Sequence, residues 1–217
     1  MFRPRLIGAT LGGRLLAGLG AAMGIALSGL VGSVSLGLPM ALLIAPMGAS
    51  AVLIFAVPAS PLAQPRAVIG GNVVSAFIGV GVAKAVPDLA LAAGLAVGAA
   101  IIVMSLLRCL HPPGGAAALT AVIGGPTIAA AGWSFPILPI AVDSVLLVLV
   151  GIAFHRVTRH PYPHRAAPAF PTAAAPHPQD VDRAIADLGE SFDISREDLD
   201  ALLARVAVHA EARRRTR

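Results

Sequence analysis

The stretch LLRCLHPPGGAAALTAVIGG, residues 106–125, places one histidine, two prolines and a glycine pair between two strongly apolar segments. A proline ring fixes φ, removes a backbone N–H, and disfavours helical geometry in the residue before it. The sequence therefore predicts a helix break at residues 111–113 and a new helix over residues 116–122. Because a helix start leaves N–H groups unpaired and carries partial positive charge, such a break inside a membrane is a candidate anion site.

Composition indicates a membrane protein. Of the 217 residues, 57% are hydrophobic and 12% are charged, and the mean hydropathy is +0.83. A soluble domain is about half apolar and about a quarter charged. The 23 glycines and the scarcity of aromatic residues favour transmembrane helices that pack closely through small side chains. A lipid bilayer is therefore the expected environment.

Charge divides the chain into two parts. Residues 1–155 contain six Lys or Arg and two acids, whereas residues 156–217 contain ten Arg and nine acids. We predict a transmembrane domain over residues 1–155, a Pro/Ala-rich linker over 156–178 and a cytoplasmic helical tail over 179–217. Because the basic residues are dispersed among acids, we expect no nucleic-acid partner.

Six apolar segments, each near the ~20 residues that a helix needs to cross a bilayer, follow one another in the first domain. They are residues 15–34, 36–57, 67–86, 89–107, 114–132 and 135–154. The predicted fold is all-α, a polytopic membrane helical bundle of about six transmembrane helices.

The positions of Lys and Arg predict the orientation of this bundle. Three arginines before residue 15 place the N-terminus inside, and Arg66 and Arg108 mark further inside loops. Lys84 is the one basic residue that this orientation places outside. The Arg-rich tail should also be inside, which requires residues 114–132 to cross fully; a re-entrant hairpin there would place the tail outside. We expect a multi-pass protein of a bacterial inner (plasma) membrane with both termini cytoplasmic.

A weak internal repeat relates the two halves of the predicted bundle. PMGASAV at residues 46–52 and PGGAAAL at residues 113–119 share the pattern P-x-G-A-x-A-apolar at an offset of 67 residues. Three spans per half would give the halves opposite orientations, a 3+3 inverted repeat, which places substrate where broken helices meet. Chance is the alternative explanation, because Ala and Gly are abundant throughout.

The runs PMGASAVLIFAVPASPLAQPRAVIGGN (residues 46–72) and LHPPGGAAALTAVIGG (residues 110–125) resemble the HPP family of integral membrane proteins. Some plant and cyanobacterial members transport nitrite, so the resemblance implies carriage of a small inorganic anion, most specifically nitrite. Many bacterial members carry paired CBS domains after the membrane region; the tail here is similar to the segment that precedes them, and we expect a bacterial member that lacks them. Asn72 stands where the family often has histidine.

The candidate substrate-binding residues surround the two breaks and add nearby hydroxyl and amide groups. They are Pro46, Gly48, Ala49, Ser50, Asn72, His111, Pro112, Pro113, Gly114, Gly115, Ala116 and Thr120. Backbone N–H groups at the two helix starts, with the Ser50 and Thr120 hydroxyls, would bind the anion. The alternative is that these small residues serve only close helix packing.

Two ionisable side chains lie where a membrane protein rarely places them without a reason. His111 at the break could bind the anion, carry a proton or bond a freed carbonyl group. Asp143 is the only acid inside a predicted span, and it could couple protons or pair with His111 or Arg108. As the possible partner of Asp143, Arg108 is a candidate coupling or structural charge. The alternative is that Arg108 lies at the cytoplasmic interface.

Two other functional classes compete with a transporter. The sequence lacks HExxH and GxSxG motifs and clustered carboxylates, so we expect no enzyme. With a single cysteine, Cys109, and no Cys/His cluster, we expect no metal and no cofactor. The remaining alternative is a membrane-anchored scaffold or sensor whose tail binds a partner. Small-residue helices and an apolar tail face also predict a homo-oligomer.

Overall fold

A computed structural model describes residues 10–36, 45–164, 178–188 and 196–215, and all regular elements in these ranges are helical. The membrane bundle contains α1 (Leu11–Leu36), α2 (Ala45–Ala56), η2 (Pro61–Ala63), α3 (Pro65–Ala85), α4 (Leu89–Leu106), α5 (Pro112–Ile123), α6 (Gly125–Ala131), η3 (Gly132–Ser134), η4 (Pro136–Ala141) and α7 (Val142–Thr158). Two tail helices follow, α8 (Pro178–Leu188) and α9 (Arg196–Arg215). The prediction of an all-α polytopic bundle is confirmed.

Four of the described segments are long and apolar enough to cross a membrane as continuous helices. They are residues Leu11–Val31, Pro65–Ala85, Leu89–Leu106 and Pro136–Thr158. The predicted fifth span is not straight, because the chain bends by 96° between α5 and the segment that follows it. Gly125, with φ +79°, occupies a left-handed backbone conformation at this bend, which a residue with a side chain rarely adopts. The second predicted span contains only the 12-residue α2, and residues 37–44 before it lie outside the described part.

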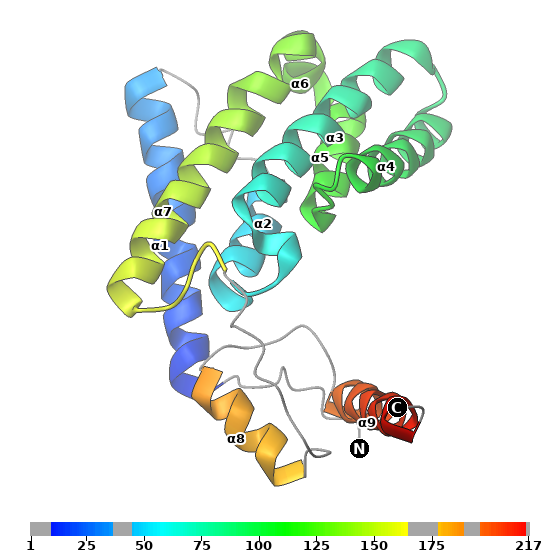
Figure 1. The fold of residues 1–217 in the computed structure, drawn as a ribbon. Coiled ribbons are helices and arrows are strands. Elements are labelled where there is room, and N and C mark those ends of the chain that lie inside the picture. Colours follow the sequence, from blue (N-terminus) through cyan, green and yellow to red (C-terminus); the bar gives the residue numbers. More distant parts are fainter. Residues whose placement is uncertain (1–9, 37–44, 165–177, 189–195, 216–217) are drawn as a thin grey trace, which may run out of the picture.

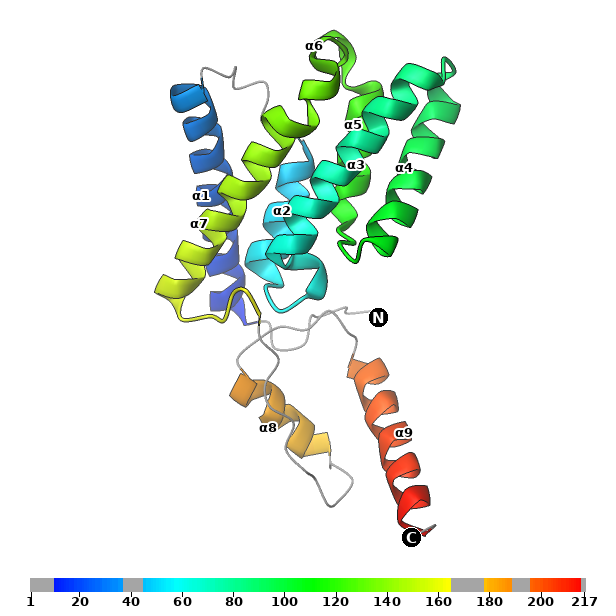
Figure 2. The same ribbon diagram turned by 45° about the horizontal axis from the view of Figure 1, so that its top comes forward.

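The bundle helices alternate in direction. Figure 2 shows α1, α3 and α5 running one way and α2, α4 and α7 running the other, so that α1 begins at the end of the bundle where α7 finishes. The turn at η2 and the connection between α4 and α5 lie at that same end, while α6 lies at the opposite end. Despite the bend after α5, the described bundle thus starts and finishes at the same end, as the predicted even number of passes requires.

The helix packing agrees with the predicted inverted repeat. A shift by the 67 residues that separate Pro46 from Pro113 places Ala45–Ala56 of α2 on Pro112–Ile123 of α5, and both helices have 12 residues. Helix α1 packs against α2 and α7, just as α4 packs against α5 and α3. Since each equivalent pair also runs in opposite directions (Figure 2), the two halves are related as an inverted repeat.

Helices α3 and α5 approach each other closely because both present small residues. A Cβ atom added at Gly79 would meet the Ala118 carbonyl oxygen and lie 2.8 Å from Ala121 Cβ. A Cβ added at Gly114 would lie 2.7 Å from Ser75 Oγ. This packing confirms the role that the sequence gives to small residues between transmembrane helices.

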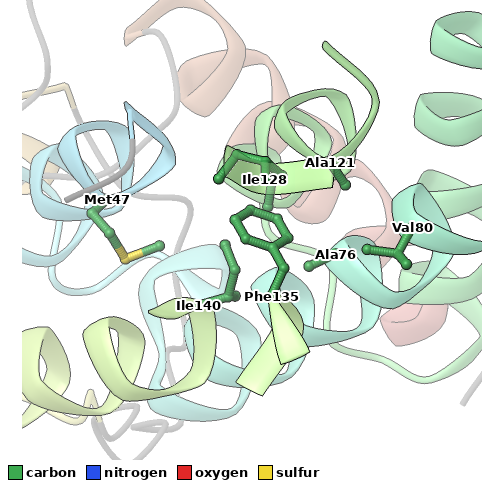
Figure 3. Packing of buried hydrophobic residues seen from close by; sticks show 8 residues of the cluster. Met47, Ala76, Val80, Ala121, Ile128, Phe135 and Ile140 are labelled. Carbon is green, nitrogen blue, oxygen red and sulfur yellow. The ribbon is translucent and has the colours of Figure 1, made fainter. Parts of the chain in front are cut away.

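An apolar cluster packs beside α3 and α5 and supports the bend. Figure 3 shows Phe135 among Ala76, Ile128 and Ile140, with Met47 of α2 facing the same group. Phe135 and Ile140 are fully buried, and Ile128 of α6 is 7% exposed. The short helix after the bend is thereby held against the bundle (Figure 1).

The membrane body extends past residue 155, where the sequence placed its boundary. Helix α7 continues to Thr158, and Tyr162 is buried with its hydroxyl donating to the Ala63 carbonyl at 2.9 Å. The His164 N–H donates to Gln64 Oε1 at 2.8 Å. Residues 159–164 thus bind back onto η2, and most of the predicted linker, residues 165–177, lies outside the described residues.

We expect both ends of the bundle chain to face the same side of the membrane. Single cysteines at Arg14 and Arg159, in a Cys109→Ser background, should react with an impermeant thiol reagent added from the cytoplasmic side. The reason is that five arginines lie at the end of the bundle where α1 begins and α7 finishes: Arg14, Arg66, Arg108, Arg156 and Arg159. A cysteine at Asp88, in the turn before α4, should react only from the other side. Labelling of Arg159→Cys and Asp88→Cys from one side would contradict this topology.

Gly79→Ala should destabilise the protein by about 1–3 kcal/mol, because the added methyl group overlaps the α5 backbone. The matched control is Gly18→Ala on α1, where a Cβ would have no neighbour within 4 Å. The denaturation midpoint in detergent measures both variants. Equal midpoints for the two would show that the close approach of α3 and α5 is not required.

Candidate functional site

Five polar side chains form a cluster inside the bundle, and none of them is exposed. The cluster consists of Ser50, Asn72, Ser75, His111 and Ser144, each with a relative exposure of 0%. They come from α2, α3, the residue before α5, and α7. We call this group the polar cluster. Polar groups away from water are costly unless they are hydrogen-bonded, so each partner within the cluster matters.

The polar cluster reaches the middle of the bundle. At 1.5 Å per residue, Asn72 lies about 10 Å and Ser75 about 15 Å along α3, a helix of 21 residues and roughly 31 Å. His111 lies nearer the end, because it precedes α5 and contacts η2. The cluster therefore extends from the η2 end of the bundle to its mid-depth.

Two glycines bring His111 next to α3. A Cβ added at Gly71 would lie 2.5 Å from His111 Cβ and 2.7 Å from the Cys109 carbonyl oxygen. A Cβ added at Gly114 would lie 2.9 Å from the Gly71 carbonyl oxygen. Side chains at these two positions would hold α3 away from the start of α5. The glycines thus allow the imidazole of His111 to reach α2 and η2.

A continuous hydrogen-bond chain runs through the polar cluster. His111 Nδ1 lies 2.8 Å from the Leu62 carbonyl oxygen, and His111 Nε2 lies 2.8 Å from Ser50 Oγ. Asn72 Nδ2 then donates to Ser50 Oγ and to Ser144 Oγ, both at 3.2 Å. Ser144 Oγ contacts Met47 Sδ at 3.8 Å. Five segments of the chain are thereby connected across the two halves of the repeat.

The partner at Nδ1 defines the tautomer of His111. A backbone carbonyl oxygen can only accept a hydrogen bond, so Nδ1 must carry the hydrogen that it donates to Leu62. In the neutral ring Nε2 then has only a lone pair, and the Ser50 hydroxyl must donate to it. The direction of the hydrogen bond between Ser50 and His111 therefore reports the protonation state of His111.

Several buried polar atoms of the bundle have no hydrogen-bond partner among the described residues. Within the polar cluster these are Asn72 Oδ1 and Ser75 Oγ, and close by in sequence to Ser144 is Asp143 Oδ2. Ser28 Oγ on α1 is a further one. Each such group costs about 1–3 kcal/mol when its desolvation is not offset. These atoms mark positions where a bound small molecule or ion would gain partners.

The start of α5 offers fewer free N–H groups than the sequence suggested. The helix begins directly at Pro112, because proline fits the first helical positions, and His111 is the preceding cap residue. Pro112 and Pro113 have no N–H, and the Gly114 N–H donates to the His111 carbonyl at 2.8 Å. Side chains, rather than this helix start, therefore supply the donors of the polar cluster.

The structure places the twelve candidate binding residues in different surroundings. Ser50, Asn72 and His111 are in the polar cluster, and Pro46 accepts a hydrogen bond from Ser50 Oγ at 3.1 Å. Pro113 and Gly114 are buried in helix packing, whereas Gly48, Ala49, Pro112 and Ala116 are exposed and Gly115 is half-buried. Thr120 Oγ1 donates to the Ala116 carbonyl of its own helix at 2.7 Å. Close backbone approach occurs at Gly114, since a Cβ at Gly115 would meet only Val97, at 3.8 Å.

The two candidate charges lie apart. Arg108 is exposed in the connection before α5, with φ 54°. Asp143 is 4% exposed in the first turn of α7, next to Ser144. No ion pair joins Asp143 to His111 or Arg108 in the described part of the chain, where His111 is bonded to Leu62 and Ser50 instead.

The sequence interpretation missed Ser75 and Ser144. Ser75 lies three residues after Asn72, a spacing that puts both on one face of a helix, and that signal was available. Ser144 could not be assigned from sequence, because its contact with Asn72 joins residues 72 positions apart. Among the described residues, no group of three or more His, Cys, Asp or Glu side chains is placed to hold a metal ion.

Comparison with known proteins gives one family match and two relatives. The family described as "HPP, transmembrane region" matches residues 8–163. A transmembrane protein of Dictyostelium discoideum is 38% identical over 124 residues, which are 55% of this chain and 43% of the relative. A second transmembrane protein of that organism is 36% identical over 121 residues, 54% of this chain and 39% of the relative. The match thus spans about two fifths of each relative, and no solved structure matches.

Ser50→Ala should lower the free energy of unfolding by about 1–3 kcal/mol, because it removes the shared partner of His111 and Asn72. Ser134→Ala is the matched control, since the exposed Ser134 hydroxyl bonds only the Ala131 carbonyl. Chemical denaturation in detergent measures both. A Ser50→Ala protein as stable as the control would show that the hydrogen-bond chain does not support the fold.

Proposed function

This chain belongs to the HPP family of integral membrane proteins, and from that premise we propose that it carries a small inorganic anion across the membrane. Nitrite is the proposed substrate, because some plant and cyanobacterial members of this family transport it and the membership of this chain implies a related cargo. The membrane we propose is a bacterial inner membrane, with the arginine-rich end of the bundle on the cytoplasmic side. The polar cluster is the proposed site of the anion.

One observation supports this proposal most strongly: polar atoms without partners lie at the mid-depth of a membrane bundle. Asn72 Oδ1 and Ser75 Oγ are both buried and unpaired. A protein that served only as an anchor or scaffold would gain stability from apolar side chains at these positions. Polar groups inside a membrane domain are instead characteristic of substrate and ion pathways. This difference favours a transporter over the scaffold alternative.

The donors in the polar cluster suit a small monovalent anion. The Ser50, Ser75 and Ser144 hydroxyls and the Asn72 amide are neutral, and each can donate a hydrogen bond. The two ends of an amide have the same shape, so a rotated Asn72 would accept from Ser50 and Ser144 and turn its N–H groups toward the unpaired position. The single hydrogen of Ser50 is then used, so in that arrangement His111 Nε2 must donate to Ser50 and Pro46 receives no hydrogen from it. Neutral donors bind an anion with modest strength, which transport requires for release.

The inverted repeat provides a means of alternating access. Helices α2 and α5 are equivalent, run in opposite directions and meet where Ser50 contacts His111. Movement of one half against the other would open the polar cluster first to one side and then to the other. Met47 contacts Ser144 Oγ and packs in the same apolar cluster as Phe135 (Figure 3), so this packing would close the polar cluster on the side of α6.

A homo-oligomer is part of the proposal. Gly94 and Gly98 on α4 are exposed, and a Cβ at either would have no neighbour within 4 Å. Their four-residue spacing is the arrangement through which transmembrane helices of two copies pack closely. Mass measurement in detergent and in lipid tests this part separately from transport.

Purified protein in liposomes should take up nitrite faster than protein-free liposomes do. Asn72→Leu should abolish the protein-dependent flux, because it removes the central amide and replaces it with an apolar side chain of similar size. The control is Ser105→Ala, since the exposed Ser105 hydroxyl bonds only the Ile101 carbonyl of its own helix. The readout is nitrite content of the vesicles over time.

Each variant must first elute as a single species of wild-type size in detergent. Undiminished flux in folded Asn72→Leu would remove the polar cluster as the anion site. Absence of protein-dependent nitrite flux in the folded wild type would contradict the proposed function itself and favour a scaffold.

A further inference from the structure

The Ser50 hydroxyl has two possible acceptors, and the protonation state of His111 decides between them. The Ser50 hydroxyl has a single hydrogen, yet its oxygen lies 3.1 Å from the Pro46 carbonyl and 2.8 Å from His111 Nε2. If His111 is neutral, Ser50 must donate to Nε2, and no hydrogen remains for Pro46. If both ring nitrogens carry hydrogen, Nε2 donates to Ser50 and Ser50 donates to Pro46. The Asn72 amide then occupies the second lone pair of Ser50.

Both N–H groups of an imidazolium ion would thus have an oxygen acceptor in the polar cluster. Nδ1 donates to the Leu62 carbonyl, and Nε2 donates to Ser50. The neutral ring also fits this pocket, with the Ser50 hydroxyl reversed. His111 can therefore gain and lose a proton by rotation of one hydroxyl group, without movement of any helix.

In the part of the chain that the structure describes, no acidic side chain is bonded to the His111 ring as a counter-charge for the imidazolium ion. Arg66 of α3 and Arg108 are positive and exposed at the η2 end, and Arg66 donates to the Leu107 carbonyl at 3.0 Å. The helices α2, η2 and α5 contain no charged residue, and the nearby Cys109 side chain is a thiol. Asp143 directly precedes Ser144 on α7, and it is not paired with His111. A buried charge without a partner is very costly.

A small anion in the polar cluster would supply the missing charge. We infer that His111 is the proton-binding residue of the transport cycle, so that the anion and one proton cross the membrane together as a neutral pair. This inference rests on the proposed function. The proton binds at Nε2 when the anion enters and leaves from Nε2 when the anion departs. The empty carrier then returns with a neutral His111.

The test measures nitrite and protons in the same liposomes. An inward nitrite gradient should acidify the lumen, reported by an enclosed pH-sensitive dye, because electroneutral co-transport carries a proton inward with each nitrite ion. A membrane potential set with potassium and valinomycin should not change the nitrite flux. Protein-free liposomes give the background due to passive entry of nitrous acid, which is subtracted.

His111→Gln should lose the protein-dependent acidification, because the amide keeps a hydrogen-bonding group but cannot take up a proton. The matched control is His155→Gln, which alters the other buried histidine of the bundle. His155 Nε2 lies 2.8 Å from the Ile54 carbonyl, and its ring packs on Phe55 and Phe154 at the end of α7. The control should retain both nitrite flux and acidification. If His155→Gln does not fold, His160→Gln replaces it.

The outcomes separate this inference from the proposed function. Nitrite flux that follows the membrane potential and moves no protons would overturn the inference while leaving nitrite transport in place. Coupling that persists in His111→Gln but disappears in Asp143→Asn would assign the proton to Asp143 and would also overturn it. Absence of nitrite flux in the folded wild type would remove both proposals together.

Discussion

Inside a bilayer, every polar group that lacks water must find its partner within the protein, and this constraint governs the start of α5. Three hydrogen bonds of His111 meet it there. The His111 carbonyl accepts from the Gly114 N–H, while its ring bonds the Leu62 carbonyl on one side and Ser50 on the other. The break in the chain is thereby tied to both neighbouring segments. The same bonds place a titratable ring at the entrance of the polar cluster, so structural support and proposed chemistry depend on one side chain.

Close packing of α3 against the second half of the repeat makes those bonds possible. Gly71, Gly79 and Gly114 remove the side chains that would separate the backbones, and Asn72 can then reach both Ser50 and Ser144. The small residues therefore have a packing role, as the simpler interpretation of the sequence held. Their packing nevertheless creates the geometry of the polar cluster, because the His111 imidazole and the Asn72 amide reach the same Ser50 hydroxyl only when the helices are this close.

The repeat symmetry of the backbone does not extend to the polar side chains. At the 67-residue offset, Ser50, Asn72 and Ser75 correspond to Ala117, Pro139 and Val142. The polar groups of α2 and α3 therefore have no polar equivalents in the second half. One half carries the hydrogen bonds, and the other contributes His111 and Ser144 to complete them. Such asymmetry gives the proposed carrier a single binding site on a pseudo-symmetric frame.

The sequence by itself determined the all-α membrane bundle, because long apolar runs can satisfy their backbone hydrogen bonds in lipid only as helices. It also determined the break at His111, because consecutive prolines cannot continue a helix, and it identified Ser50, Asn72 and His111 as candidates. It did not determine the 96° bend after α5 or the continuation of α7 to Thr158. The packing of the helices was needed to show that Ser144 joins the polar cluster and that Asp143 stands apart from His111 and Arg108. Contacts between residues far apart in the chain depend on helix packing, and local sequence preferences carry no information about them.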